Sequence, residues 1–301
     1  MNKHYAAAIS AFVIWGFFSI PLRTLKEFSA GEILYFRILF SALILLIIVF
    51  GFKRKDLKKD WAFFTGLAKT KRREVIMLTL AGGALLTVNW LTFIYIVNNI
   101  NIKTASFSYL ICPVITAVLG YALIKERLTS LQWIAVALCA ISCILMGIDS
   151  TLELGYSFLT AFTYALYLIT QRRNQGFDRM VMLGIQVLFS FLILNLFYGQ
   201  LIHAVPVKTE FYAIIISIAA LFTVLPLFLN LFALNRINSA TIGILMYLNP
   251  LINFSIAFIV FKETISPIQV FGYVIILIAL ILFNYPNFVK IKAAVSFQKP
   301  A

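Results

Sequence analysis

Acid–base and metal chemistry need carboxylate, histidine or cysteine side chains that lie together, and this chain keeps them apart. All eleven carboxylates and both histidines lie in connections or at the ends of long apolar runs. Cys139 and Cys143 lie one helical turn apart inside such a run, which suits either two metal ligands or, with Ala135, a stripe of small residues for helix packing. No histidine or carboxylate lies nearby in the sequence, so we favour packing and expect no catalytic residue, no metal and no cofactor.

Arg37 is the charged side chain that falls inside an apolar run, 32–51. An arginine at the centre of a membrane helix costs ~2.5–3.5 kcal/mol on insertion scales, and less near an end. The favoured interpretation is that its long stem snorkels to the outer headgroups. The alternative is that Arg37 faces a central cavity and binds an anionic group.

Polar and aromatic side chains recur inside the apolar runs where helices would meet. Buried amides and hydroxyls need partners, which are either each other or a substrate. For a single residue helix–helix bonding is the simpler role, whereas a cluster favours a shared cavity. The candidate substrate-binding residues are Trp15, Arg37, Asn89, Trp90, Tyr109, Pro113, Tyr164, Asn230, Tyr247, Asn249 and Pro250.

Pro113 and Pro250 stand in the middle of two apolar runs, 103–123 and 240–261. A proline in a helix interior removes one backbone donor and kinks the helix. We expect each to free a carbonyl near mid-membrane, where it could bind a neutral or zwitterionic solute. The alternative is that both kinks only shape the packing.

The elements that must position these residues are transmembrane helices. Of the 301 residues, 62% are apolar and 12% charged, and the mean hydropathy is +0.98, whereas a soluble protein is roughly half apolar and a quarter charged. The sequence predicts an all-α polytopic membrane protein with ten transmembrane helices. They cover roughly 4–22, 32–51, 75–97, 103–123, 131–147, 152–170, 180–201, 212–234, 240–261 and 267–284.

The basic residues predict the orientation. The net charge of +14 does not indicate nucleic-acid binding, because the basic residues lie in short connections beside apolar runs. Nineteen of them fall on the side of the N-terminus and five on the other side, which predicts both termini in the cytoplasm. The connection 52–74 holds nine of the nineteen; it either lies on anionic headgroups or serves only to fix the topology.

The chain contains one pattern twice, at a constant offset of 137 residues. Segment 98–132 pairs with 235–269, so that Asn98 matches Asn235, Asn101 matches Asn238, Thr104 matches Thr241, Pro113 matches Pro250, and Lys125-Glu126 matches Lys262-Glu263. Five helices in each half is an odd number, so the halves must have opposite orientations in the membrane. We expect two inverted five-helix repeats, 1–147 and 148–290, and a cytoplasmic tail, 291–301.

These segments resemble a known family. The run TASFSYLICPVITAVLGYALIKERLTSLQW, its echo ATIGILMYLNPLINFSIAFIVFKETIS and the pair Asn89-Trp90 are similar to the EamA-type drug/metabolite transporters, and in part to their RarD subgroup. Ser108 and Cys112 depart from the Gly and Asn usual in that subgroup. The resemblance implies a permease of the inner cell membrane that moves a small organic solute, often outward.

The sequence therefore predicts a secondary transporter that works by alternating access. Its partners would be a small-molecule substrate and the lipid bilayer, and a homodimer stays open. The alternatives are a membrane enzyme acting on lipid, which needs a carboxylate, histidine or cysteine cluster at an interface, and a channel, which needs filter loops or charged rings. No carboxylate or histidine stands in mid-membrane as a proton relay, so we expect a uniporter or an exchanger.

Overall fold

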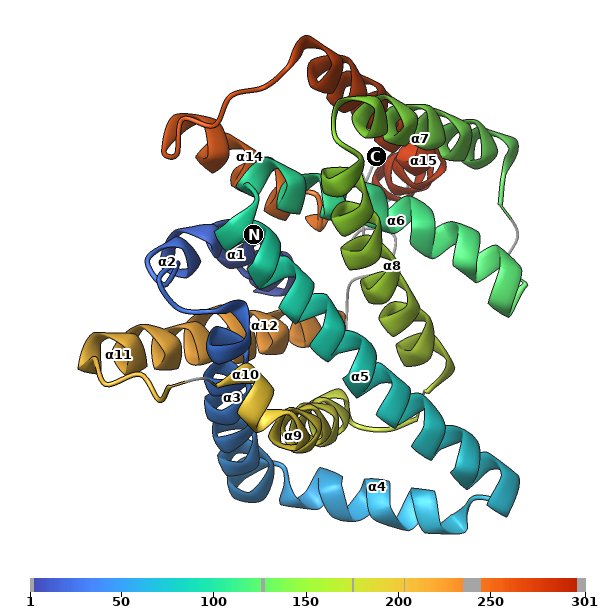
Figure 1. Ribbon diagram of the computed structural model, residues 1–301. Helices are drawn as coiled ribbons and strands as arrows, with labels where there is room; N and C mark the ends of the chain where they lie inside the picture. The colour runs from blue at the N-terminus through green and yellow to red at the C-terminus, as the bar shows by residue number, and fades with distance from the viewer. Residues whose placement is uncertain (1–2, 126–127, 175, 203, 235–244, 297–301) are drawn as a thin grey trace.

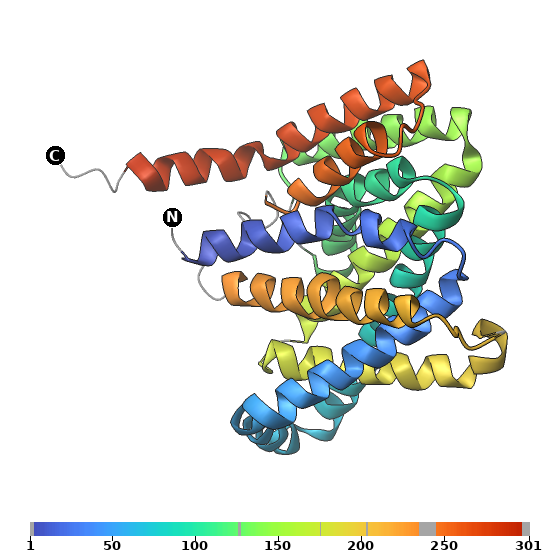
Figure 2. The ribbon, with the colours of Figure 1, turned by 90° about the vertical axis from the view of Figure 1, so that its left-hand side faces the viewer.

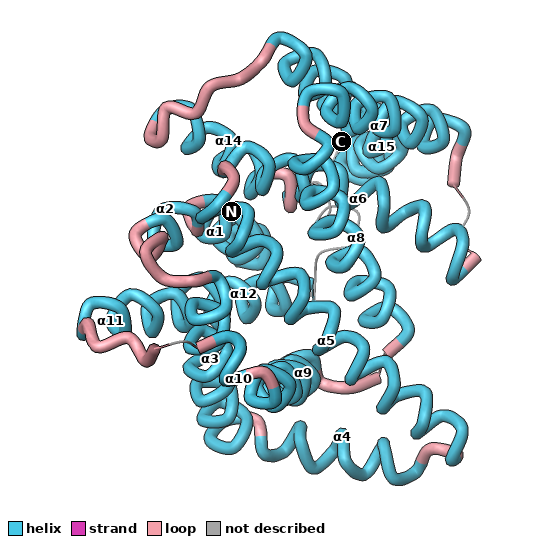
Figure 3. Tube along the Cα trace, viewed as in Figure 1, coloured by secondary structure: helices cyan, strands magenta, loops and turns pink. Residues whose placement is uncertain are grey.

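In the computed structural model, which describes residues 3–125, 128–174, 176–202, 204–234 and 245–296, the regular elements of those residues are all helical (Figure 3). The expected all-α class is confirmed. The elements are α1 (Lys3–Gly16), α2 (Ser19–Arg23), α3 (Ala30–Phe52), α4 (Arg54–Gly66), α5 (Lys69–Asn99), α6 (Ile102–Ile124), α7 (Ser130–Asp149), α8 (Thr151–Arg173), α9 (Arg179–Leu196), α10 (Tyr198–Leu201), α11 (Thr209–Ser217), the π-helix η1 (Ile218–Val224), α12 (Leu225–Leu234), α14 (Leu248–Ile259) and α15 (Pro267–Ser296).

Seven segments of the described chain are long and apolar enough to cross a membrane. They are Lys3–Arg23, Ala30–Phe52, Lys69–Asn99, Ile102–Ile124, Thr151–Arg173, Arg179–Leu196 and Thr209–Asn230. Three shorter apolar helices, Ser130–Leu145, Leu248–Ile259 and Pro267–Phe283, fall on the three remaining predicted runs. Seven predicted spans are thus matched by helices of sufficient length, and a total of ten stays a prediction.

Local sequence sets where several of these helices begin. Ser29 and Glu32 form a reciprocal capping box at the start of α3, which satisfies two backbone donors that would otherwise lack partners. Asn101 caps α6 through Thr104 N–H at 2.7 Å, and Asp178 caps α9 through two backbone N–H groups. Short polar residues at these positions fix the register of the helices that follow.

The basic connection contains a helix that the sequence analysis did not predict. Helix α4 turns across the end of the molecule between α3 and α5 (Figure 1). Most of its side chains are exposed, including Trp61 at 66%. Asp60 is buried, and its carboxylate accepts a hydrogen bond from Asp178 N–H. The Asp60 carboxylate therefore helps to tie the connection to the start of α9.

The packing joins helices from distant parts of the chain. Figure 1 shows α3, α9 and α12 on one side and α6, α7, α14 and α15 on the other, with α5 and α8 crossing between them. One buried apolar cluster combines residues of α3 and α5 with residues of α9 and η1. A second combines residues of α6, α7 and α8 with residues of α15. Each cluster thus draws on both sequence halves.

The charged connections gather at two opposite ends of the helices. Figure 2 shows the start of α1, the end of α15 and α4 at one end, and the connection between α14 and α15 at the other. At the first end Lys53 pairs with Asp178 at 2.9 Å. At the second end Arg23 pairs with Glu263 at 3.0 Å. These contacts agree with the assignment of connections to alternating sides.

Candidate functional site

A cavity of about 80 Å³ lies where α1, α3, α5, α6, α8, η1 and α14 converge. Aromatic rings form most of its wall, and Arg37 is the arginine among the lining residues. The lining residues are Phe12, Trp15, Phe18, Arg37, Leu86, Trp90, Phe93, Tyr109, Tyr164, Tyr167, Phe222, Thr223, Leu227, Met246 and Asn249. An apolar pocket with a few convergent polar groups is the usual form of a small-molecule site.

The Arg37 side chain is buried within this wall, at 3% exposure. Its Nε donates to the Thr223 hydroxyl at 2.9 Å. Its Cζ lies 4.7 Å from the ring centre of Phe18 and 4.9 Å from that of Trp90, so both rings make cation–π contacts. The favoured interpretation, that Arg37 snorkels to the headgroups, is wrong, because partners far away in the sequence hold the side chain inside the protein.

The π-helix η1 supplies the second polar feature of the wall. Pro226 has no N–H, so it cannot bond to the carbonyl of Phe222 four residues earlier. That carbonyl instead accepts from Trp15 Nε1 at 3.1 Å. The Thr223 hydroxyl donates to the Ile218 carbonyl, five residues back, at 3.2 Å. The wide turn therefore orients Thr223 toward Arg37 and ties α1 to η1.

Tyrosines form another part of the wall. The rings of Tyr109 and Tyr164 meet edge to face, with centres 5.7 Å apart. The Tyr109 hydroxyl donates to Asn89 Oδ1 at 3.3 Å, and Asn89 Nδ2 donates to the Thr160 carbonyl at 2.8 Å. Asn89 is fully buried behind the wall, so it holds Tyr109 in place and links α5 to α8.

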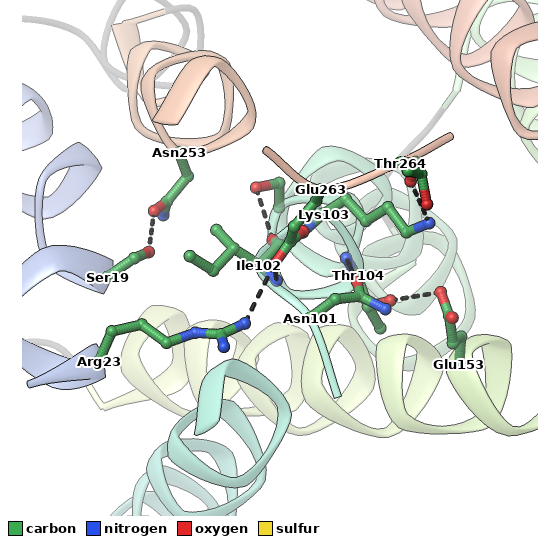
Figure 4. A network of polar contacts seen from close by, with 11 residues as sticks. Ser19, Arg23, Asn101, Ile102, Lys103, Thr104, Glu153, Asn253, Glu263 and Thr264 are labelled. Carbon is green, nitrogen blue, oxygen red and sulfur yellow. Dashed lines mark hydrogen bonds and ion pairs between the residues drawn. The ribbon is translucent and has the colours of Figure 1, made fainter. Parts of the chain in front are cut away.

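A polar network closes the end of the molecule that holds Glu263 (Figure 4). The Glu263 carboxylate accepts from Ile102 N–H at 2.8 Å and Lys103 N–H at 3.0 Å, and it pairs with Arg23. A carboxylate at a helix N-terminus is favoured by the free N–H groups and the helix dipole. The Glu263 carboxylate thus fastens the connection after α14 to α6 and α2.

Six of the eleven candidate residues line the cavity: Trp15, Arg37, Trp90, Tyr109, Tyr164 and Asn249. Asn89 lies directly behind it. The remaining four, Pro113, Asn230, Tyr247 and Pro250, are not among the lining residues. Tyr247 packs against the second buried cluster instead. The sequence analysis thus named residues on helices that meet at the cavity, but it did not predict correctly which side chains face it.

The expectation for Pro250 needs a correction. A turn at residues 246–247 precedes α14, and Pro250 lies in the first turn of that helix rather than in mid-helix. The Met246 carbonyl, four residues before Pro250, accepts from Asn249 N–H at 3.3 Å. Pro113 does lie inside α6. Pro226, which the sequence analysis passed over, leaves the carbonyl of the lining residue Phe222 to accept from Trp15.

The sequence analysis also missed most of the apolar lining and Thr223. Phenylalanine is abundant throughout the chain, so no pattern distinguishes the cavity-facing rings from lipid-facing ones. A polar Thr223 three residues before Pro226, inside a long apolar run, was the sequence feature that could have indicated this part of the site. Among the described residues no group of three histidine, cysteine, aspartate or glutamate side chains could hold a metal ion. The cysteines there are free thiols, and Cys112 and Cys139 are buried.

Comparison with known proteins identifies the family. The model of the EamA-like transporter family matches residues 2–148 and again residues 151–285. The uncharacterized transporter YojE of Bacillus subtilis is 29% identical over 94% of this chain and 94% of its own length. The RarD protein of Escherichia coli is 25% identical over 92% of each chain. A crystal structure that covers 94% of this chain and 96% of its own superposes with a TM-score of 0.61 at 11% identity, which shows a shared fold alone.

The expected resemblance is therefore confirmed, and it extends over nearly the whole chain. Both matched segments contain lining residues of the cavity, such as Arg37 in the first and Asn249 in the second. This multi-helix membrane protein belongs to the EamA-like transporter family.

Proposed function

We propose that the protein is a secondary carrier that moves a small organic solute by alternating access. Its ten transmembrane helices would form two inverted five-helix repeats, 1–147 and 148–290. The carrier would lie in the inner cell membrane, with both termini and the tail 291–301 in the cytoplasm. The observation that carries the proposal is the cavity, because its wall draws on both repeats. A site at the interface of two repeats is the arrangement that rocking between two states requires.

The Glu263 network supports the gating part of the proposal. Its contacts join α2, α6 and the connection after α14 at one end of the cavity-lining helices. An ion pair with several hydrogen bonds breaks and forms as a unit, as a gate must. On the predicted topology this end faces away from the cytoplasm. We therefore assign the network as the outer gate in its closed state.

The rival functions lack such support. A lipid-modifying enzyme needs a reactive cluster, and the cavity wall offers one arginine among aromatic and neutral polar side chains. A channel needs a continuous path, whereas the Glu263 network binds the helix ends together. A carrier and a channel also differ in kinetics, because only a carrier saturates and is stimulated by solute on the opposite side.

Solute flux in proteoliposomes tests the proposal. We expect saturable, trans-stimulated efflux of at least one of four labelled probes: benzoate, benzamide, phenylalanine and phenethylamine. Leu86→Trp should abolish it, because Leu86 is buried at the cavity wall. Leu80→Trp, on the same helix but 38% exposed, is the matched control and should retain flux. Absence of saturable flux for all four probes, or equal flux in both variants, contradicts the carrier.

A further inference from the structure

We propose that Arg37 is the substrate-anchoring group and that the carrier's solute is an organic monocarboxylate, bound through its carboxylate to the guanidinium. That the protein transports this solute rests on the proposed function. That it binds an anion is argued separately, from the geometry around Arg37.

Among the described residues, no opposite charge pairs with the buried guanidinium of Arg37. The side chain is 3% exposed, and its Nη1 makes no hydrogen bond in the described part of the chain. Its hydrogen-bonded partner, Thr223, is neutral and is itself oriented by the Ile218 carbonyl. The cavity wall contains no aspartate or glutamate. Buried charges are ordinarily paired or fully hydrogen-bonded, so this donor points to a partner that arrives from the cavity.

The contacts of Arg37 show which of its donors is left for that partner. Nε is engaged by Thr223, and the rings of Phe18 and Trp90 pack against the guanidinium at 4.7 and 4.9 Å. Nη1 is thus left as a buried donor with no hydrogen-bond partner in the described part of the chain. A guanidinium binds a carboxylate through two parallel N–H groups, with charge-assisted bonds stronger than neutral ones. The fixed stem and packed rings make Arg37 ready for such a contact before the solute arrives.

The charge of the wall selects among solutes. One positive charge balances one carboxylate, whereas the ammonium group of a zwitterion would find no lining aspartate or glutamate. The aromatic lining residues Tyr109, Tyr164 and Phe93 offer ring faces and edges for an apolar body. Arg37 therefore favours an anion. A neutral or zwitterionic solute was the expectation from carbonyls freed by the prolines alone.

A monoanionic solute would also allow transport without an embedded proton relay. A uniporter that exports one negative charge is driven by the inside-negative membrane potential. The equilibrium ratio changes about 50-fold for each 100 mV, because one elementary charge gains about 2.3 kcal/mol across that potential. The carrier needs no mid-membrane carboxylate if its solute itself carries the charge.

The test separates binding from flux. Tryptophan fluorescence of the purified protein reports binding, since Trp15 and Trp90 line the cavity while Trp61 and Trp133 are exposed and can be changed to phenylalanine. The probes are benzoate and its neutral isostere benzamide. We expect benzoate to bind at least tenfold more tightly than benzamide. Arg37→Gln should remove the preference, and Arg37→Lys should keep part of it. Arg54→Gln, an exposed arginine on α4, is the matched control and should match the parent.

The outcomes distinguish the two proposals. Equal binding of both probes, no benzoate binding, or an unchanged preference in Arg37→Gln overturns the anion site. If Arg37-dependent benzoate binding is found but no probe shows saturable flux, the anion site stands and the carrier fails. If benzamide or phenylalanine crosses as fast as benzoate and Arg37→Gln changes neither rate, the carrier stands and the anion site fails.

Discussion

Lys125 and Lys262 share a left-handed backbone, with φ angles of 58° and 54°. They are the non-glycine residues with positive φ in the described chain, and they lie at the 137-residue offset that relates the two halves. Lys125 is the C-cap residue of α6, and Lys262 lies three residues after the end of α14, where Glu263 N–H donates to the Ala257 carbonyl at 3.0 Å. The same local conformation thus recurs at matched positions, which supports the proposed duplication.

The left-handed turn gives the first prediction. A side chain with a Cβ pays about 1–2 kcal/mol in this region, and glycine does not. We expect Lys262→Gly to raise the melting temperature in detergent, and Lys262→Val to lower it, since a β-branched residue fits this region worst. The control is Lys58, an exposed residue within α4. There glycine should destabilise by about 1 kcal/mol. The same sign for glycine at both positions contradicts the account.

The outer gate gives the second prediction. Glu263→Gln removes the charge from the contacts with Arg23, Ile102 and Lys103, and hydrogen bonds to charged groups contribute about 1.5–3 kcal/mol. We expect a cysteine at Ser106, buried one turn inside α6, to react roughly tenfold faster with an impermeant maleimide in intact cells that express a cysteine-free background.

The matched control for the gate is Glu27→Gln. Glu27 pairs with Lys208 at the same end, but its side chain is 53% exposed, and exposed pairs contribute little. Its loss should leave the labelling of Ser106→Cys unchanged. An equal increase in both variants would mean that charge at this end, and not the Glu263 contacts, controls access.

Two neighbouring carboxyls outside the membrane segments should respond oppositely to pH. Burial raises the pKa of Asp60, with the charges of Asp178 and Asp56 adding to it against the Asp178 N–H bond. Burial also acts to raise the pKa of Asp178. The hydrogen bonds from Lys53 and from backbone N–H groups outweigh that effect, so the pKa of Asp178 is lowered. The folded state thus favours protonated Asp60 and ionised Asp178.

The sign of each effect follows from those shifts. The contribution of Asp60 is present at acid pH and is lost as pH rises through its folded pKa, so Asp60→Asn should raise the melting temperature at pH 7. The contribution of Asp178 is present above its unfolded pKa and is lost as pH falls, so Asp178→Asn should lower the melting temperature at pH 7. Both effects should shrink toward about pH 3. Thermal melts across this pH range check the prediction, and changes of equal sign contradict it.

Pro226 gives the fourth prediction. Pro226→Ala restores an N–H that can bond to the Phe222 carbonyl, so Trp15 loses its acceptor and the π-turn is no longer favoured. Because Thr223 would then rotate away from Arg37, we expect transport to fall at least fivefold while the protein stays folded. Pro250→Ala is the control, since a proline in the first turn of a helix is well tolerated and its loss should matter little. Equal losses in both variants contradict the role assigned to η1.

The sequence predicted the fold further than it predicted the site. Hydropathy placed every long helix, because apolar length is a property of local sequence. The orientation of the Arg37 side chain depends on distant parts of the sequence. Thr223, its hydrogen-bonded partner, lies 186 residues away and is oriented by a π-turn that no hydropathy pattern reveals. Likewise α4 contains more charged than apolar residues, so its composition did not predict a helix.

A cysteine at the cavity wall tests alternating access most directly. Leu227 lines the cavity and is partly exposed. In a cysteine-free background, Leu227→Cys should react with an impermeant maleimide in both right-side-out and inside-out vesicles. Adding Glu263→Gln should speed the reaction from the outer side and slow it from the inner side. Labelling from one side alone in every condition, or rates that rise together on both sides, would contradict a carrier that opens its cavity to one side at a time.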